Sequence, residues 1–120
     1  MLVALVGFGV SANAQDASSF VLKKNSKIII ESAQIEPIKK GSDLLEEKMR
    51  KLGFCCVSKE IDEEDSETII AISPDRGAFR FRIYDRILDR EVFNERYVYL
   101  TTLNKVIGNF IKDITPFIEK

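Results

Sequence analysis

The stretch GAFRFRIYDRILDREVFNERYVYL, residues 77–100, decides how this chain folds. In its first half, apolar side chains alternate with Arg80, Arg82 and Tyr84. Because successive side chains of a strand point to opposite faces of a sheet, this alternation predicts one apolar face and one cationic, aromatic face. An antiparallel sheet of this kind is covered by helices on one side and open to solvent on the other. The apolar set is Phe79, Phe81 and Ile83.

The same stretch predicts a hairpin that bends within residues 86–90 and returns along residues 92–100. The returning arm alternates less regularly, because Phe93 shares its parity with two tyrosines while apolar side chains also occupy the other parity. A β-bulge or a strand buried on both faces explains such a break, and the sequence leaves both open.

Three segments before the hairpin predict strands, because each is apolar and rich in β-branched residues. A shorter segment at residues 20–22 is a candidate edge strand. The three strands are expected at residues 27–31 (KIIIE), 54–59 (FCCVSK) and 68–73 (TIIAIS).

Two segments predict amphipathic helices. The first begins with Ser42 as its N-cap, buries one apolar face, and ends at Gly53 in the left-handed conformation that glycine favours. The second begins after Thr101 or Thr102 and carries apolar residues at three- and four-residue steps until Pro116 ends or kinks it.

Together these elements predict an α+β fold. We expect a two-layer sandwich, with a four- to five-stranded, mostly antiparallel sheet and two helices on one face. A chain of 120 residues is long enough for one domain with one hydrophobic core. We expect this single domain to span residues 15–120.

The first 14 residues, MLVALVGFGVSANA, are of a different kind, because they are apolar, carry no charge and end in a small-x-small triplet. We interpret them as a signal peptide cleaved after Ala14, which predicts a periplasmic or secreted protein. The alternative is a first core strand. The run is shorter than the about 20 residues that a membrane-spanning helix needs, so we expect no transmembrane segment.

The composition argues against several classes of function. The formal net charge is -1, so no global field favours nucleic acid, and we expect no nucleic-acid partner. The chain has no histidine, which is the commonest general base and metal ligand. We therefore expect no catalytic, cofactor-binding or metal-binding residues and no enzymatic activity. The alternative is a small hydrolase or carbohydrate-active enzyme that uses Asp85 or Asp89 at the hairpin bend.

Two further clusters are candidate sites. Cys55 and Cys56 are adjacent in a predicted strand, where their side chains would point to opposite faces, so we expect two small, apolar, free residues, one or both of them buried. A vicinal disulfide or a reactive thiol stays open, because an exported chain meets an oxidising environment. The acidic run at residues 60–65 lacks the spacing and the glycine turn of a calcium loop and predicts a solvated loop.

The cationic and aromatic face of the hairpin is the candidate binding surface. Arginine and tyrosine are enriched at binding hot spots. The alternative is a solvated sheet face whose arginines pair with carboxylates across the strands. The candidate partner-binding residues are Arg80, Arg82 and Tyr84, with Arg96, Tyr97 and Tyr99 from the paired strand.

Three features together resemble a known type of domain. An apolar strand, KIIIE, leads to a helix that closes in Lys51-Leu52-Gly53-Phe54; a second strand, TIIAIS, follows an acidic loop; and a hairpin with Tyr84-Asp85 before its bend and Val92-Phe93 after it feeds an amphipathic helix. In these features residues 27–118 resemble small bacterial envelope α/β domains such as the amino-terminal domain of TolB. The resemblance implies a non-catalytic interaction domain and carries over no binding residue.

The sequence thus predicts an exported domain without enzymatic activity. We expect it to bind a protein or an envelope component through its open sheet face or an exposed strand edge. A structural subunit of an envelope assembly is a further alternative, and the sequence does not predict the oligomeric state.

Overall fold

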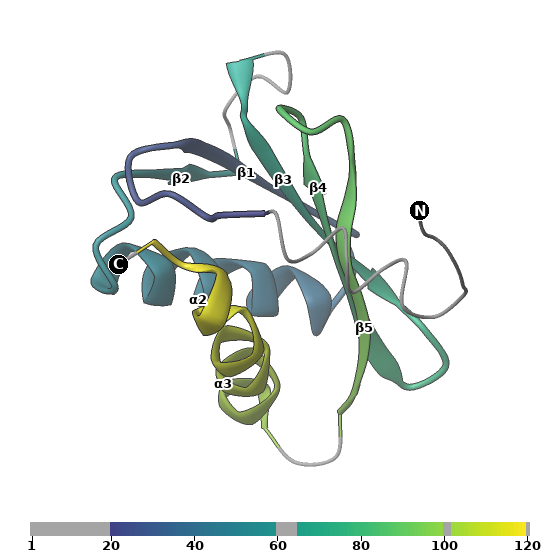
Figure 1. Ribbon diagram of the computed structural model, residues 1–120. Helices are drawn as coiled ribbons and strands as arrows, with labels where there is room; N and C mark the ends of the chain where they lie inside the picture. The colour runs from purple at the N-terminus through teal and green to yellow at the C-terminus, as the bar shows by residue number, and fades with distance from the viewer. Residues whose placement is uncertain (1–19, 60–64, 100–101, 120) are drawn as a thin grey trace.

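The structure is a computed structural model that describes residues 20–59, 65–99 and 102–119. A five-stranded sheet with the strand order β2-β1-β3-β4-β5 forms one layer, and helices α2 and α3 form the other (Figure 1). The predicted α+β class is confirmed. The strands are β1 (Lys27–Ser32), β2 (Cys56–Ser58), β3 (Thr68–Pro74), β4 (Ala78–Asp85) and β5 (Arg90–Val98), and the helices are α2 (Ile38–Lys51), α3 (Leu103–Ile114) and the short 3₁₀ turn η2 (Thr115–Phe117).

Two of the sequence predictions lie outside the described residues. They are the signal peptide at residues 1–14 and, except for Asp65, the acidic run at residues 60–65.

The sheet is mixed, so the expected antiparallel character is confirmed only in part. Strand β1 is parallel to both β2 and β3, whereas β3, β4 and β5 form an antiparallel meander. Helix α2 connects β1 to β2 and carries the chain back to the level at which β1 begins, so that β2 runs parallel to β1. Strand β2 ends beside Ile29 of β1, and β3 begins beside Ile28 on the other side of β1. The end of β2 and the start of β3 therefore lie at the same level of the sheet.

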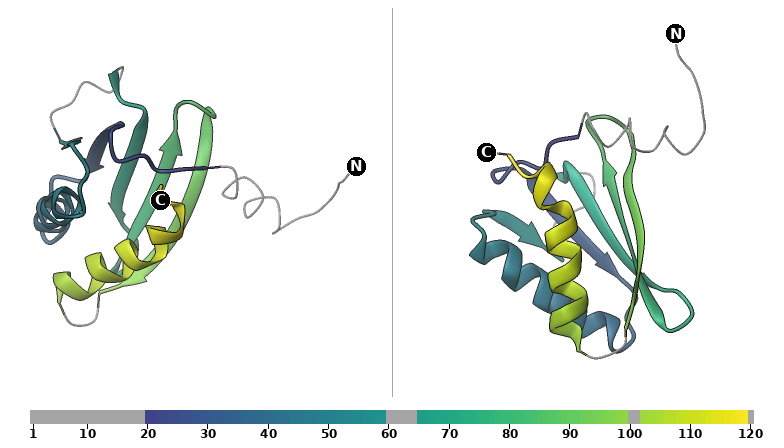
Figure 2. Two further views of the ribbon diagram at one scale, coloured as in Figure 1. Left: turned by 60° about the vertical axis from the view of Figure 1, so that its left-hand side comes forward. Right: turned by 60° about the horizontal axis from the view of Figure 1, so that its bottom comes forward.

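The two helices lie on the same side of the sheet, as predicted (Figure 2). The β4 side chains Phe79, Phe81 and Ile83 are buried on this side in one cluster with apolar residues of both helices. The Phe81 ring stacks on that of Phe110 in α3, with 4.2 Å between the ring centroids. The predicted apolar face of the hairpin is therefore the face on which the core is built.

Helix α2 begins five residues earlier than the sequence predicts. Its N-cap is Pro37, at the end of a cis Glu36–Pro37 peptide bond, and Ser42 is buried inside the helix with its hydroxyl donating to the carbonyl of Lys39. The N–H groups of the first helical residues have no intrahelical partner, so a proline at a helix start costs no hydrogen bond. Proline therefore begins this helix and does not break it. The predicted left-handed Gly53 after the helix is confirmed, with φ of 104°.

Three other local predictions have clear outcomes. Thr102 caps α3, because its side chain accepts the N–H of Lys105 at 3.2 Å. The irregularity in the returning arm is a β-bulge next to Val92, where the register of β4 with β5 shifts. Residues 20–22 do not form an edge strand of the sheet, since Leu22 pairs instead with Ile118 in an isolated bridge beside the C-terminal segment.

Candidate functional site

The face of the sheet that carries no described helix holds a depression of about 550 Å³. Its lining comes from four strands and the β4–β5 turn, so it lies over the middle of the sheet and the tip of the hairpin. Two of the lining residues, Ile69 and Ala71, are apolar, and the others surround them with charges of both signs and one phenol. These polar residues are Glu31, Arg82, Tyr84, Arg86, Asp89 and Glu91.

Part of the rim is held together by contacts within the hairpin. The Tyr84 hydroxyl donates to the carboxylate of Asp89, which the turn places in the left-handed region with φ of 56°. Aspartate tolerates this region better than most residues. This hydrogen bond raises the pKa of Tyr84 above its ordinary value of 10.0. The guanidinium of Arg82 lies 3.5 Å from the carboxylate of Glu91 on β5.

The other two predicted arginines of this face brace the β3–β4 turn. Arg80 donates to the carboxylate of Asp75 at 2.9–3.0 Å and also to the side chain of Asn94. Arg96 donates to the main-chain carbonyls of Asp75 and Arg76, at 3.3 and 3.1 Å. These two arginines therefore stabilise a turn. The cross-strand pairing of the solvated-face alternative is found instead between Arg82 and Glu91, and only Arg82 and Tyr84 of the predicted set line the depression.

Tyr97 and Tyr99 lie on the opposite face, which corrects their grouping with the arginines. Tyr97 pairs with Phe79 across the ladder and therefore shares its face; its ring lies 5.3 Å from that of Phe81, and its hydroxyl donates to Asp113 in α3. The Tyr99 ring lies 5.6 Å from that of Phe79. Sequence parity could not settle this, because the bulge and the hairpin register decide which β5 side chains share a face with the β4 arginines.

The environment of Tyr97 leads to a prediction about alkaline pH. Burial, and then the hydrogen bond to Asp113, raise the pKa of Tyr97 well above its ordinary value. The folded state thus favours the neutral phenol, a contribution that is complete below about pH 10 and is lost as the pH rises above the pKa of the unfolded chain. In a Tyr84→Phe, Tyr99→Phe variant, we expect tyrosinate absorbance at 295 nm to rise only together with alkaline unfolding. Reversible ionisation near pH 10 with an intact circular dichroism spectrum would contradict the burial argument.

The two carboxylates of the hydrolase alternative do not face one site. Asp89 lines the depression, whereas Asp85 is buried on the helix side of β4 and accepts the N–H of Ile87 at 3.1 Å in the turn. Two-carboxylate chemistry needs both groups on one bound substrate. The depression instead brings Asp89 together with Glu31 and Glu91. Glu31 is not among the predicted site residues, although its alternation with Ile30 in KIIIE places it on this face.

The two cysteines form a vicinal disulfide between Cys55 and Cys56, with an S–S distance of 2.07 Å. The expectation of two free residues in a strand is wrong, and one of the alternatives left open is the structure. The physical reason is that β2 begins only at Cys56, so Cys55 lies in the preceding connection and its side chain is not held to the opposite face.

Within the described ranges, no group of three or more His, Cys, Asp or Glu residues is arranged to hold a metal ion. In the same residues, no helix is long and apolar enough to span a membrane. No known protein family matches the chain, and no curated protein matches it as a relative. The resemblance to envelope domains stays a prediction.

Proposed function

We propose that this chain is an exported binding domain without enzymatic activity, which docks a protein of the cell envelope on the open face of its sheet. The depression on that face carries the proposal. A partner can bury the apolar surface at the centre of the depression. The cations, carboxylates and phenol around it can form oriented hydrogen bonds with the partner. The separation of Asp85 from Asp89 and the lack of histidine in the sequence favour binding over hydrolysis.

Arg82 is the side chain best suited to contact a partner. Its side chain is 56% exposed and lies 3.5 Å from Glu91, whereas that of Arg80 is 31% exposed and lies 2.9 Å from Asp75. A partner carboxylate can therefore replace Glu91 at Arg82 at little cost, because exposed ion pairs contribute only about 0–1 kcal/mol. A substitution of Arg80 would instead weaken the β3–β4 turn and confuse a binding test.

The free edge of β5 favours a second candidate, a structural subunit that associates through this strand. Ala78 exchanges both main-chain hydrogen bonds with Asp75, so Phe79 directs its N–H and C=O toward β5. Along an antiparallel ladder this direction alternates from residue to residue, so every second residue of β5 points its main-chain groups away from β4. No described strand lies on that side of β5. The bulge and the charges of β5 are features that protect edges from pairing, so we rank this candidate second. The main-chain groups that point outward belong to Asn94, Arg96 and Val98.

Site-specific photocrosslinking in cells that make the protein tests both candidates. A photoreactive phenylalanine analogue replaces Tyr84 in the depression, Asn94 at the β5 edge, or Lys105, which is exposed on α3. We expect a discrete adduct with another protein from position 84 and none from position 105. An adduct of the chain with itself from position 94, with nothing at 84, would instead favour the structural subunit.

Neutralising Arg82 tests the anchor within the same experiment. We expect Arg82→Gln to lower the yield of the position-84 adduct about tenfold, which corresponds to roughly 1.4 kcal/mol of binding free energy. The matched control is Lys105→Gln, which also removes one positive charge but lies on the helix layer. Equal yields from the two variants, with circular dichroism showing both folded, would contradict docking on this face.

A further inference from the structure

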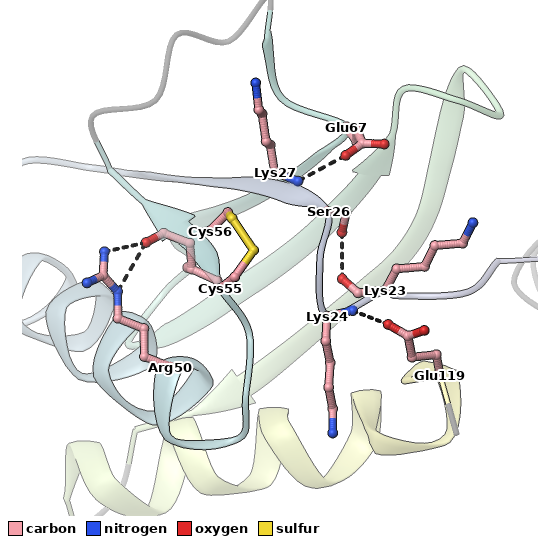
Figure 3. Close-up of a disulfide and its surroundings, with 10 residues drawn as sticks. Lys23, Lys24, Ser26, Lys27, Arg50, Cys55, Cys56, Glu67 and Glu119 are labelled. Atoms are coloured by element: carbon pink, nitrogen blue, oxygen red, sulfur yellow. Dashed lines mark hydrogen bonds between the residues drawn. A yellow bond between two sulfur atoms is a disulfide. The ribbon is translucent and has the colours of Figure 1, made fainter.

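The disulfide joins Cys55, in the connection that leads from α2, to Cys56, the first residue of β2 at the edge of the sheet (Figure 3). Strand β2 contributes nothing to the depression, so this location is separate from the proposed docking face. Cys55 is exposed and Cys56 is half-buried. Cys55 is therefore the residue of the pair that a reagent in solution reaches more easily.

The disulfide does little to hold the fold together. A disulfide stabilises mainly by closing a loop of the unfolded chain, and a bond between adjacent residues closes almost none. Other contacts already fix the chain on both sides of it. The N–H of Phe54 donates to Met49 at 3.2 Å, and the N–H of Cys55 donates to Lys24 at 3.0 Å. The guanidinium of Arg50 donates twice to the carbonyl of Val57, at 2.7 and 3.3 Å.

The side chains around the disulfide aim no charge at it. Figure 3 shows the ammonium ends of the labelled lysines directed away from the two sulfur atoms, and the guanidinium of Arg50 is engaged by the carbonyl of Val57 and the carboxylate of Glu46. Exchange at this disulfide therefore depends on the access of a reagent thiolate to the sulfur atoms.

From these observations we propose that the Cys55–Cys56 pair is a thiol–disulfide exchange site, which a dithiol reductant converts to two thiols while the domain stays folded. A thiolate of the reductant attacks Sγ of Cys55, and Cys56 leaves as a thiolate that takes up a proton. The second thiol of the reductant then displaces Cys55 from the mixed disulfide, and Cys55 is protonated in turn. The reductant becomes a disulfide, and the cysteine pair gains two electrons and two protons.

The first test measures reduction of the native full-length protein by dithiothreitol, without denaturant. Free thiols are counted by alkylation and mass spectrometry, and folding is followed by circular dichroism. We expect two alkylated cysteines with an unchanged spectrum, and retention of the treated protein on immobilised phenylarsine oxide, which captures adjacent thiols. Reduction only in denaturant, unfolding upon reduction, or two free thiols in protein kept in air would each overturn the proposal.

Single-cysteine variants test which of the two sulfur atoms is more accessible to a reagent. Cys56→Ser leaves the exposed Cys55, and Cys55→Ser leaves the half-buried Cys56, so the two variants are matched controls for each other. We expect the thiol of Cys56→Ser to react with a disulfide reagent such as dithionitrobenzoate about tenfold faster, because exposure and thiolate character set this rate. Equal rates, or a faster Cys55→Ser, in folded variants would contradict attack at Cys55.

Discussion

Replacing Phe110 with alanine is expected to lower the free energy of unfolding by about 3–5 kcal/mol, a large part of the total stability of a small domain. The ring is fully buried in α3, and its centroid lies 4.2 Å from that of Phe81 in β4. It also contacts the rings of Phe93 and Tyr97 in β5, with centroids 5.6 and 6.2 Å away. Removing it takes away the side chain that joins α3 to two strands and leaves a cavity that the sheet cannot fill.

Urea denaturation followed by circular dichroism measures this loss. The matched control is Ile87→Ala, which truncates an apolar side chain that is 70% exposed in the β4–β5 turn and should change stability by no more than about 0.5 kcal/mol. A Phe110→Ala loss of less than about 1 kcal/mol would show that α3 does not pack as described.

A double-mutant cycle separates the Phe81–Phe110 contact from burial alone. Both rings are fully buried and stacked at an interplanar angle of 21°. Because the second alanine cannot remove a contact that is already lost, we expect the double variant to be less destabilised than the sum of the two singles, by about 0.5–1.5 kcal/mol. If the two losses of stability are exactly additive, the contact between the rings contributes nothing, and each ring is stabilised by its other neighbours.

The part of the fold that sequence could predict is the part that depends on local patterns. The alternation through Phe79, Phe81 and Ile83 fixes the two faces of β4, because strand periodicity is a property of consecutive residues. The same reasoning placed Arg80 and Arg82 on the open face, where the structure has them. Capping by Thr102 is equally local.

The features that sequence could not predict depend on long-range geometry. The faces of Tyr97 and Tyr99 follow from a hairpin register and a bulge, which no single strand specifies. The depression joins Glu31 of β1 to the β4–β5 turn, and this requires the parallel pairing of β1 with β3. The disulfide depends on β2 starting at Cys56, two residues later than its apolar pattern predicts.

Gly41 is the position where the approach of the two helices can be tested most directly. It is buried in α2, and a Cβ atom there would lie 3.0 Å from a ring carbon of Phe79, 3.7 Å from Leu103 and 3.8 Å from Ile107. The backbone of α2 thus runs directly against α3 and the core of the sheet. Gly108 in α3 is the matched control, because it is exposed and a Cβ atom there meets nothing within 4 Å.

Alanine at the two positions should have different effects on the free energy of unfolding. Both substitutions gain about 1 kcal/mol of helix propensity, so Gly108→Ala is expected to stabilise the domain by about 0.5–1 kcal/mol. At Gly41 the gain is offset by the contact with Phe79, whose ring is enclosed by buried neighbours, and we expect no stabilisation or a net loss.

Leucine should enlarge this difference, because its side chain has no room at Gly41 and only solvent around it at Gly108. Overpacking a dense core costs about 1–3 kcal/mol, and here it would also push α2 away from α3. We therefore expect Gly41→Leu to be at least about 2 kcal/mol less stable than Gly108→Leu in urea denaturation. If the two leucine variants are equally stable, α2 does not lie against Phe79 and Ile107. The assignment of both helices to one layer, on which the proposed docking face depends, would then be wrong.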